Sequence, residues 1–458
     1  MTSELLSRVP AHVFRIRDVL ARANKRAWVV GGCVRDLLRG GVPADWDVCT
    51  DAKPEELLKL FPRAIPTGIA HGTVTVVLDH QPYEVTTLRG EGAYTDGRRP
   101  DAVHFVADIE HDLARRDFTV NAIAIDSETG ALVDPFGGQS DLAAKVLRAV
   151  GRAEERFSED GLRVLRAARF CATLGFTLEP ATRAAIEPNL DTFRKVSPER
   201  VRDEWVKAMK AEKPSIAFDV MRETGILGVT CPELLEGVGM EQNRFHAYDV
   251  WRHSLVCMDA CPRDAMLRIA GLFHDVGKPR SRAFSDKTKD YTFYDHDRIG
   301  AEIVEPICAR LRFSNDERAR VTHLVRHHLF HYDAWTDAAV RRWIRRVGKE
   351  RLEDLYAINE ADARAKGTDA TSCYEALAAL KIHVEKVLAE GTALSTKDLA
   401  IDGHVLMNEL GMKPGRALGT VLNQLLEEVT GEPGLNTREA LIGRVQEILK
   451  ATAVESKS

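Results

Sequence analysis

Residues Gly31–Asp47, GGCVRDLLRGGVPADWD, follow the short apolar run Ala27–Val30 and end in two aspartates one residue apart. A glycine turn between a strand and a helix lets backbone N–H groups face a phosphate, because no side chain blocks the approach and the helix dipole favours an anion. Arg35 falls on the first turn of the expected helix. Asp45 and Asp47 are expected at positions i and i+2 of a strand, where both carboxylates point to one side and can share hard cations. The stretch therefore predicts a phosphate cradle beside a metal site.

Each half of this pattern is common on its own, since a glycine pair before an arginine is usually a tight turn and D-x-D is usually a solvated loop. Their joint occurrence resembles the signature of the polymerase-β-like nucleotidyltransferases. GGCVRD together with DWD resembles the branch that contains the class II tRNA nucleotidyltransferases and the bacterial poly(A) polymerases. The resemblance implies that Gly31, Gly32 and Arg35 bind a nucleotide and that Asp45 and Asp47 hold the cations.

Length and composition set the class of protein. The 458 residues exceed one compact core and predict three or four domains of ~100–200 residues each. Hydrophobic residues at 44% and charged residues at 29% are ordinary for a soluble globular protein. No run of about 18 apolar residues occurs, and Met1–Pro10 lacks a signal pattern, so neither a membrane span nor export is expected.

The cysteines and the net charge add two expectations. Eight cysteines without a C-x-x-C motif fit reduced thiols and a cytoplasmic location. A net charge of −5 means that any RNA contact depends on local basic patches and not on a globally basic body.

Two neighbouring segments, Thr73–Leu78 and Tyr83–Leu88, alternate and are rich in β-branched residues. They are expected to form an antiparallel pair beside the glycine-turn strand, with His80–Pro82 as the turn. Glu84 lies in the second segment, where the enzymes that the chain resembles carry a third catalytic carboxylate; an isolated surface glutamate is the alternative. Two cations ~3.5–4 Å apart clamp the attacking and leaving oxygens of an in-line displacement. Oxygen ligands favour Mg²⁺, so this glutamate joins the two aspartates as the predicted catalytic set.

The segment Arg89–Pro100, RGEGAYTDGRRP, is rich in glycine and charge, which is typical of a mobile loop. In the class II tRNA enzymes that the chain resembles, a flexible loop at this position is needed to add the final adenosine, and it is shortened in relatives that add only cytidines. This chain has the full-length loop with its RRP ending. The resemblance therefore favours complete CCA addition.

The run Leu113–Asp126, LARRDFTVNAIAID, combines two arginines with an apolar tail that is typical of a strand or the entry to one. Arginine suits phosphate because its planar fork donates hydrogen bonds in pairs. A surface ion pair between Arg116 and Asp117 is the alternative. RRDFTVNA resembles a motif of the same family, which implies that Arg116 and Asp117 contact the nucleotide and that Asn121 supports ribose or loop geometry.

A helix is expected from Ser158, SEDGLRVLRAARF, because a serine cap and acids in the first turn precede leucines at helical spacing. Asp160, Arg163 and Arg166 lie at i, i+3 and i+6, a pattern that is often only a salt-bridged helix face. The stretch resembles the base-selecting helix of the family, in which protein replaces a nucleic-acid template. The resemblance implies that Asp160 and Arg163 read the edge of the base and that Arg166 contacts the phosphate or the base.

A second group of candidate residues consists of histidines and aspartates beyond residue 250. LRIAGLFHDVGKP places His274 and Asp275 side by side, and the outlying members are His253, His296, His327 and Asp362, with His328 as an alternative to His327. A single histidine on an apolar helix is more often a core residue, but such ligands converging in a bundle suit a divalent transition metal that activates water. The set resembles the HD phosphohydrolases. That resemblance implies a divalent metal (Ni²⁺, Mn²⁺ or Mg²⁺) and phosphatase or 2′,3′-cyclic phosphodiesterase activity.

Val340–Arg351, VRRWIRRVGKER, has the spacing of an amphipathic helix. Its apolar residues are expected to face inward, and its first four arginines, Arg341, Arg342, Arg345 and Arg346, are expected to face outward. Those arginines form either a solvated face or a surface that positions phosphates.

The resemblance covers nearly the whole chain and implies one architecture. It is an α+β fold with an N-terminal mixed-sheet nucleotidyltransferase head followed by all-α neck, body, HD and tail helices. The expected domains are 1–150 (head), 151–240 (neck and body, for base selection and tRNA binding), 241–370 (HD) and 371–458 (tail, in contact with tRNA). The implied activity is template-independent addition of CCA to the 3′ end of tRNA from CTP and ATP, with release of pyrophosphate.

Three alternatives stay open. A poly(A) polymerase usually carries an arginine-rich strand where this chain has TGIAHGTVTV, from Thr67, which argues against it. A partial enzyme would add only CC or only A. An HD hydrolase with a non-catalytic RNA-binding head is a different class, although all the acids of the head are present. The oligomeric state is open.

Overall fold

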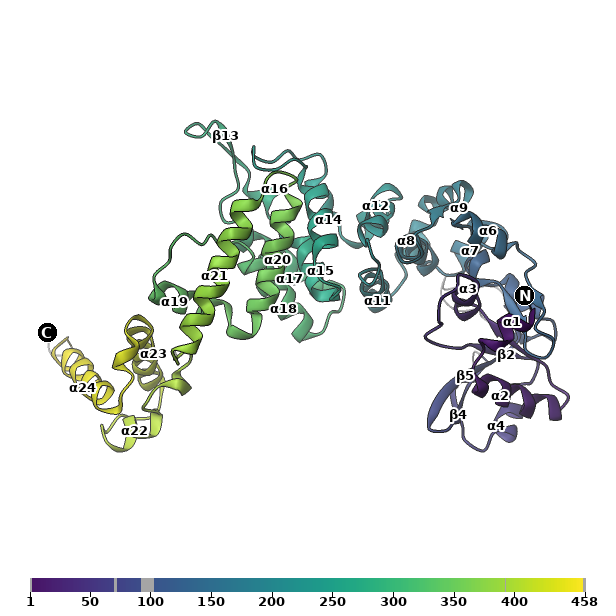
Figure 1. Ribbon diagram of the computed structural model, residues 1–458, viewed down its shortest axis with the longest axis horizontal. Helices are drawn as coiled ribbons and strands as arrows, with labels where there is room; N and C mark the ends of the chain where they lie inside the picture. The colour runs from purple at the N-terminus through teal and green to yellow at the C-terminus, as the bar shows by residue number, and fades with distance from the viewer. Residues whose placement is uncertain (1, 70–71, 92–102, 392, 456–458) are drawn as a thin grey trace. The chain divides into compact units, whose positions relative to one another are not determined.

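The computed structural model describes residues 2–69, 72–91, 103–391 and 393–455 (Figure 1). Most of the loop predicted at Arg89–Pro100 lies outside these residues. The chain divides into two compact units, Met1–Leu235 with Ile307–Phe313, and Glu236–Pro306 with Ser314–Ser458. Within the described residues, no helix combines the length and the apolar character that crossing a membrane requires.

The first unit is built around a mixed sheet. Over the described residues the strands run in the order β3-β4-β5-β2-β1-β8-β9. Within the described part of this sheet, β2 and β5 pair in parallel and the other neighbours pair antiparallel. The strands are β1 Ala27–Val30, β2 Val48–Thr50, β3 Ala64–Gly68, β4 Thr73–Leu78, β5 Gln81–Thr87, β8 Ala124–Asp126 and β9 Leu132–Val133. The predicted N-terminal mixed sheet is therefore confirmed.

Side chains of the central strand alternate between two apolar cores. Val29 packs into a core with α2 (Ala11–Arg22), α3 (Gly32–Leu38) and α4 (Pro54–Leu60) on one face of the sheet. Trp28 and Val30 join a second core with α5 (Ile109–Ala114) on the opposite face. This alternation follows from the period of two along a strand. With both faces covered, the end of β1 is fixed in place, and so is the turn that follows it.

The hairpin that carries Glu84 differs from the prediction in its turn. The turn is Asp79 and His80, with φ of 50° and 65°, and Gln81 already belongs to β5. Two left-handed residues make the tight turn that matches the twist of the flanking strands, so His80–Pro82 as the turn is wrong. The hairpin also does not lie directly beside β1, because β2 separates them.

Short elements and helices complete the first unit. They are α1 Thr2–Ser7, β6 Arg89–Glu91, β7 Val103–Phe105, η2 Thr119–Asn121, α6 Gly138–Ala144, β10 Val146–Leu147, α7 Ala153–Glu159, α8 Leu162–Leu174, β11 Thr177–Leu178, α9 Pro180–Ala184, η3 Glu187–Asn189, α10 Leu190–Phe193, α11 Pro198–Ala208, α12 Ser215–Glu223, α13 Ile226–Thr230 and η4 Pro232–Gly237. The helix predicted from Ser158 is in fact two helices. Ser158 lies in the last turn of α7, where its hydroxyl donates to Glu155 O, and it caps nothing.

The second unit is almost entirely helical, as predicted. Its elements are α14 Val250–Ala260, α15 Ala265–Phe273, α16 Lys278–Ser281, β12 Ala283–Ser285, β13 Asp290–Thr292, α17 His296–Arg310, α18 Asn315–His327, α19 Asp337–Val347, η5 Lys349–Arg351, α20 Leu352–Ala365, α21 Thr371–Ala389, η6 Thr396–Asp398, α22 Gly403–Asn408, α23 Arg416–Gly431, η7 Pro433–Leu435 and α24 Arg438–Glu455. Helices α14, α15 and α20 pack against one another (Figure 1). A separate apolar core joins α22, α23 and α24.

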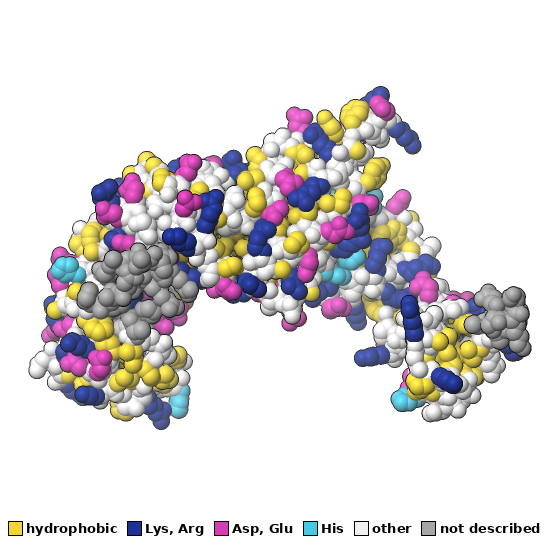
Figure 2. All heavy atoms as spheres, turned by 180° about the vertical axis from the view of Figure 1, so that it is seen from behind, with side chains coloured by type: hydrophobic (Ala, Val, Ile, Leu, Met, Phe, Trp, Pro, Cys, Tyr) yellow, Lys and Arg dark blue, Asp and Glu magenta, His cyan; other side chains and the backbone are white. Residues whose placement is uncertain are grey.

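Helix α19 is amphipathic as predicted, except at Arg341. Val340, Trp343, Ile344 and Val347 are buried. Arg341 was expected to face outward, but it is 5% exposed and its Nε donates to Thr430 O at 2.8 Å. A guanidinium can be buried when carbonyl acceptors satisfy its N–H groups, and here it attaches α19 to α23. Elsewhere on the surface, Lys and Arg alternate with Asp and Glu over the face seen in Figure 2, in keeping with the net charge of −5.

Candidate functional site

The two aspartates of the opening stretch do not lie on a strand. Asp45 and Asp47 belong to the segment that leads into β2, and the prediction of a strand there is wrong. Asp47 is nevertheless held by the sheet, because its carbonyl accepts a hydrogen bond from Val30 N at 3.1 Å. The parallel register pairs Val48 with Val85. Asp47 directly precedes Val48, and Glu84 directly precedes Val85. The two acids therefore lie next to each other on adjacent chain segments.

The three predicted catalytic acids line one cleft. Asp45, Asp47 and Glu84 contribute to the wall of a hollow of about 610 Å³. Burial raises the pKa of Asp47, Arg116 opposes the rise and the Asp45 carboxylate adds to it. Carboxylates that line one cleft offer only oxygen donors, which is the donor set that suits Mg²⁺. By the chemistry of their donor atoms, these acids fit a divalent cation.

The glycine turn is packed against the predicted arginines. Gly31 has φ of 80°, a backbone conformation that favours glycine, and a Cβ there would lie 2.6 Å from Arg116 Nη1 and would displace that guanidinium. Gly32 opens α3, where a Cβ would only touch Arg35 at 3.6 Å. Arg35 Nη1 donates to Asn121 Oδ1 at 2.7 Å. Residues from two stretches that lie about 80 positions apart in the sequence therefore meet at the N-terminus of α3.

Asp117 connects this turn to the helix that follows the head. It is buried and accepts from Arg166 Nε at 2.8 Å and from Asn121 Nδ2 at 3.0 Å. Burial opposes ionisation, but Arg166 and Asn121 outweigh it and lower the pKa of Asp117 to about 2. Arg166 lies on α8. An ion pair that is buried at Asp117 thus fixes α8 to the segment that contacts the glycine turn.

The predicted base-selecting residues lie where α7 ends and α8 begins. Asp160 precedes α8, so it is not on one helix face with the two arginines; its Oδ1 accepts from Leu162 N at 3.0 Å and its Oδ2 from Arg200 Nη2 at 2.8 Å. Arg163 is 8% exposed. Its guanidinium donates to Arg115 O at 2.8 Å and to Arg156 O at 2.9 Å. Base reading by Arg163 therefore requires an exchange of these hydrogen bonds for bonds to the base.

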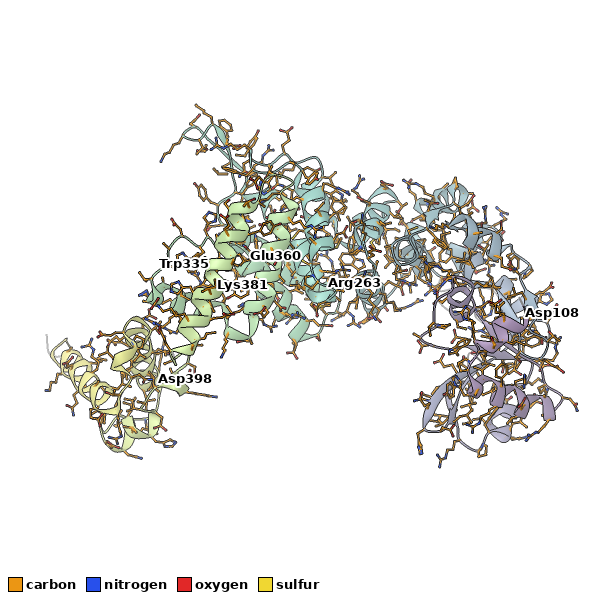
Figure 3. All side chains as sticks on the ribbon, in the orientation of Figure 1. Asp108, Arg263, Trp335, Glu360, Lys381 and Asp398 are labelled. Carbon is orange, nitrogen blue, oxygen red and sulfur yellow. The ribbon has the colours of Figure 1, made fainter. Side chains whose placement is uncertain are left out.

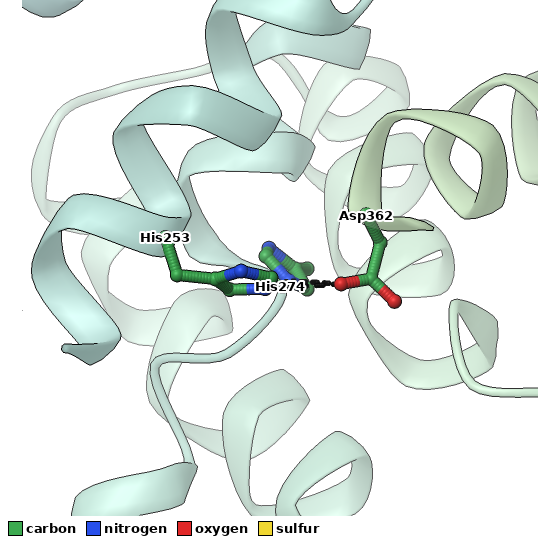
Figure 4. A group of neighbouring side chains, drawn as sticks. All are labelled: His253, His274 and Asp362. Carbon is green, nitrogen blue, oxygen red and sulfur yellow. Dashed lines mark hydrogen bonds and ion pairs between the residues drawn. The ribbon is translucent and has the colours of Figure 1, made fainter. Parts of the chain in front are cut away.

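In the second unit, histidines and aspartates from five segments converge. They form two triads with ligand atoms within 4.8 Å of one another, His253, His274 and Asp362, and Asp275, His296 and His328. We call these six residues the histidine–aspartate cluster. Figure 4 shows His253 from α14, His274 just after α15 and Asp362 from α20 pointing toward one another.

All four histidines of the cluster are held by the same ring nitrogen. The Nδ1 atoms of His253, His274, His296 and His328 lie 3.0, 2.8, 2.7 and 2.8 Å from the carbonyl oxygens of Ala365, Gly271, Phe293 and Val325. A carbonyl only accepts, so each Nδ1 carries a hydrogen. The Nε2 atoms then face the centre of the cluster, as in histidines that bind a metal.

The carboxylates complete a donor set that fits a cation. Asp275 Oδ2 lies 3.2 Å from Nε2 of both His253 and His274, and Asp275 Oδ1 lies 3.4 Å from His296 Nε2. Asp362 Oδ1 lies 3.0 Å from His253 Nε2. Burial opposes ionisation of Asp275, but His274 and Lys278 outweigh it and hold the pKa of Asp275 well below its usual range. Imidazole and carboxylate ligands suit a borderline transition metal.

His327, the predicted ligand, lies outside this cluster. Its ring packs against His323 with centroids 4.5 Å apart, and burial followed by the nearby His323 lowers its pKa to about 4. His328 is buried, and its Nε2 lies 3.3 Å from His296 Nε2. Adjacent residues on a helix point about 100° apart, so only one of the two can face the cluster. The choice depends on helix packing that the HH pair alone does not reveal.

Lys278 is a further residue of this site that the sequence analysis did not select. It is 5% exposed, and its Nζ lies 2.6 Å from Asp275 Oδ2 and donates to Gln242 Oε1 at 2.6 Å. Its signal in the sequence is the lysine that follows three residues after Asp275 in HDVGK. A buried ammonium beside the cluster adds a positive charge for an anionic group.

One relative matches nearly the whole chain. The A-adding tRNA nucleotidyltransferase of Deinococcus radiodurans is 37% identical over 438 residues, which cover 92% of this chain and 96% of that enzyme. The chain belongs to the class II tRNA nucleotidyltransferase family. Its residues 27–148 match the poly A polymerase head domain, residues 175–237 match the "Probable RNA and SrmB- binding site of polymerase A", and residues 294–445 match domain 2 of the tRNA nucleotidyltransferases.

The chain also resembles a solved structure along its length. The CCA-adding enzyme of Bacillus stearothermophilus in complex with CTP is 28% identical, with a TM-score of 0.70 over 95% of this chain and 98% of that chain. The CCA-adding enzyme of Lactobacillus delbrueckii subsp. bulgaricus is 45% identical over 234 residues, 51% of this chain and 59% of that enzyme. The match thus spans little more than half the length of that relative.

Proposed function

We propose that the chain adds CCA to the 3′ end of tRNA from CTP and ATP, without a template and with release of pyrophosphate, in tRNA maturation and repair. The observation that carries the proposal is the cleft shared by Glu84 of β5 and by Asp45 and Asp47 of the segment that leads into the adjacent β2. The CCA-adding enzymes among its relatives support the choice of nucleotides. Membership of the family supports tRNA as the acceptor.

Different residues of the head bind the triphosphate and the metal ions in this reaction. Gly31 leaves the N-terminus of α3 open to the triphosphate, and Arg35 and Arg116 supply positive charge beside it. Asp45, Asp47 and Glu84 would hold Mg²⁺, which would make the 3′-hydroxyl more acidic and offset the charge of the pyrophosphate.

Selection of the base falls to the break between α7 and α8. Asp160 has acceptor oxygens suited to an exocyclic amine, and Arg163 has donors suited to ring and carbonyl acceptors. Arg166, fixed by its ion pair to Asp117, positions the nucleotide from the same helix as Arg163. Asp160→Ala or Arg163→Ala should blur the choice between CTP and ATP and leave some phosphoryl transfer.

Addition of the final adenosine alone is a second candidate. The relative that matches nearly the full length of the chain is an A-adding enzyme. Its similarity includes the second unit, whereas the Lactobacillus CCA-adding relative matches only 51% of the chain. The loop on which the prediction of complete addition depends lies mostly outside the described residues.

Three tRNA substrates separate the candidates. tRNA that ends before CCA, after the first C, or after CC is incubated with Mg²⁺ and labelled CTP and ATP, and the product ends are sequenced. A CCA-adding enzyme completes all three, and an A-adding enzyme extends only the substrate that ends in CC. Long adenosine tails on unrelated RNA would instead identify a poly(A) polymerase, and extension of none would contradict the proposal.

The second unit adds a metal-dependent phosphohydrolase, acting as a phosphatase or a 2′,3′-cyclic phosphodiesterase. The observation that carries this part is the four inward Nε2 atoms beside two carboxylates. The paired change His274→Ala and Asp275→Ala should remove bound transition metal, measured by mass spectrometry of the purified protein, and abolish phosphoester hydrolysis. Nucleotide addition by the head should be retained. Hydrolysis that survives in the metal-free variant would refute this part.

A further inference from the structure

The histidine–aspartate cluster is most exposed to solvent at Asp362. The side chain of Asp362 is 17% exposed, whereas those of His253 and Asp275 are 0% and 2% exposed. The remaining three, His274, His296 and His328, are 1%, 7% and 2% exposed. A substrate must touch the cluster from outside, so its path leads past the Asp362 carboxylate.

Asp362 lines a cavity of about 310 Å³, which we call the Asp362 cavity. Its walls come from α20, from α21 and from the segment 329–333 that precedes α19. Small-molecule sites occupy ~300–1,000 Å³, so this cavity holds one small ligand. It is too small for a folded RNA and large enough for a single nucleotide unit.

Lys366 supplies the positive charge of this cavity. It follows Asp362 by four residues, which places both on one face at the end of α20. The acceptor of its ammonium group is the Cys373 sulfur at 3.7 Å. Sulfur is a weak acceptor, so an anionic oxygen that enters the cavity would bind this ammonium better than the thiol does.

Tyr332 supplies an aromatic wall that is already held in place. Its hydroxyl lies 2.9 Å from His383 Nδ1, and His383 Nε2 lies 2.6 Å from Asp337 Oδ1. The Asp337 carboxylate can only accept, so the hydrogen is on Nε2 and the tyrosine donates to Nδ1. Trp335, labelled in Figure 3, packs edge-on against the tyrosine ring with centroids 5.6 Å apart. A fixed aromatic face favours stacking of a base.

We infer that the Asp362 cavity is the substrate pocket of the histidine–aspartate cluster and that it takes one nucleoside phosphate unit, with the base against Tyr332 and the phosphate charge at Lys366. The inference rests on the phosphohydrolase proposed for the second unit. Such a nucleoside phosphate unit can be a free mononucleotide or the 3′-terminal nucleotide of an RNA. A phosphate ester without a base fills only the charged end of the cavity.

Binding tests the pocket without turnover. Equilibrium dialysis of adenosine 3′-phosphate against the metal-free full-length protein gives Kd for the wild type, Tyr332→Leu and Lys366→Met. Both changes should raise Kd about tenfold, the effect of losing one stacking or ionic contact. Tyr332→Phe and Lys366→Arg should bind like the wild type. The matched controls are the exposed Tyr374→Leu on α21 and Lys287→Met in the β12–β13 turn, neither of which lines the cavity.

Hydrolysis by the Mn²⁺-loaded protein tests the link to the cluster. The esters are adenosine 2′,3′-cyclic phosphate, an oligonucleotide that ends in the same group, and glycerol 2-phosphate. Tyr332→Leu should lower kcat/KM about tenfold for the cyclic nucleotide and for the oligonucleotide, and it should leave kcat/KM for glycerol 2-phosphate unchanged. Whichever of the two nucleotide substrates has the higher kcat/KM with the wild type identifies the source.

The outcomes separate the two proposals. Hydrolysis with equal Kd and equal ester preference in all variants would overturn the pocket and leave the hydrolase standing. Failure of the wild type to hydrolyse any ester would overturn the hydrolase and, with it, the role assigned to the cavity.

Discussion

Single side chains settle how the histidine–aspartate cluster is assembled. The HH pair in the sequence left His327 and His328 as alternatives, and only the orientation of the end of α18 separates them. The hydrogen bonds from Nδ1 to backbone carbonyls were also not predictable, because they depend on the backbone geometry next to His274, His296 and His328 and, for His253, on the packing of α14 against α20. The adjacent His274 and Asp275 were predictable because the dipeptide itself brings two ligands together.

Replacing one histidine at a time should distinguish these neighbours. His328→Ala removes a buried Nε2 from the cluster and should weaken binding of a divalent transition metal by at least about tenfold, measured by calorimetry with Mn²⁺. His327→Ala, which changes a residue outside the cluster, is the matched control and should bind like the wild type. Weaker metal binding by His327→Ala, together with wild-type binding by His328→Ala, would instead identify His327 as the ligand.

The ion pair of the buried Asp117 with Arg166 should make stability depend on pH. The pKa of Asp117 is lowered from 3.8 to about 2. A carboxyl group whose pKa is lower in the folded state than in the unfolded state stabilises the fold at pH values above its unfolded pKa. This stabilisation is lost as the pH falls through the folded pKa, here between about pH 4 and pH 2. Asp117→Asn should therefore cost about 2 kcal/mol of unfolding free energy at pH 7.

Urea denaturation at several pH values measures this contribution. The difference in unfolding free energy between the wild type and Asp117→Asn should become smaller below pH 4. Asp191→Asn, whose side chain is 92% exposed, should change stability little at any pH. A gap for Asp117→Asn that stays constant down to pH 3 would show that the ion pair is not its cause.

Among the elements, those with strong local patterns agree with the sequence-based expectations. The two strands of the Glu84 hairpin and the apolar face of α19 follow from alternation and helical spacing. The break between α7 and α8 does not, because SEDGLRVLRAARF carries an uninterrupted helical pattern. The break depends instead on a tertiary contact, since Gly161 packs directly on the backbone of α10.

Gly161→Ala tests that contact. A Cβ at Gly161 would lie 2.6 Å from Thr192 O and 2.7 Å from Phe193 N, both backbone atoms that cannot swing aside. The change should lower the unfolding free energy by about 1–3 kcal/mol, measured by urea denaturation. Gly228→Ala in α13, where a Cβ would meet only Leu235 at 3.9 Å, is the control and should be neutral or stabilising. A neutral Gly161→Ala would refute the steric account.

For the molecule as a whole, the order of a mixed-sheet head followed by helices was predictable, because motifs along the chain identified each part in turn. What could not be predicted was how distant segments meet: the register that aligns Asp47 with Glu84, the carbonyls that hold Arg163 and the cavity beside Asp362. Each depends on packing between elements far apart in the sequence.

The central claim is that the paired aspartates of the head carry nucleotidyl transfer, and one measurement tests it most directly. Purified wild type and the double variant Asp45→Asn and Asp47→Asn are incubated with Mg²⁺, labelled CTP and ATP, and a mixture of tRNA ending before CCA and after CC. The wild type should extend the tRNA, and the double variant should be inactive while it remains folded and still hydrolyses phosphoesters through the second unit. Extension by the double variant at the wild-type rate would contradict the account.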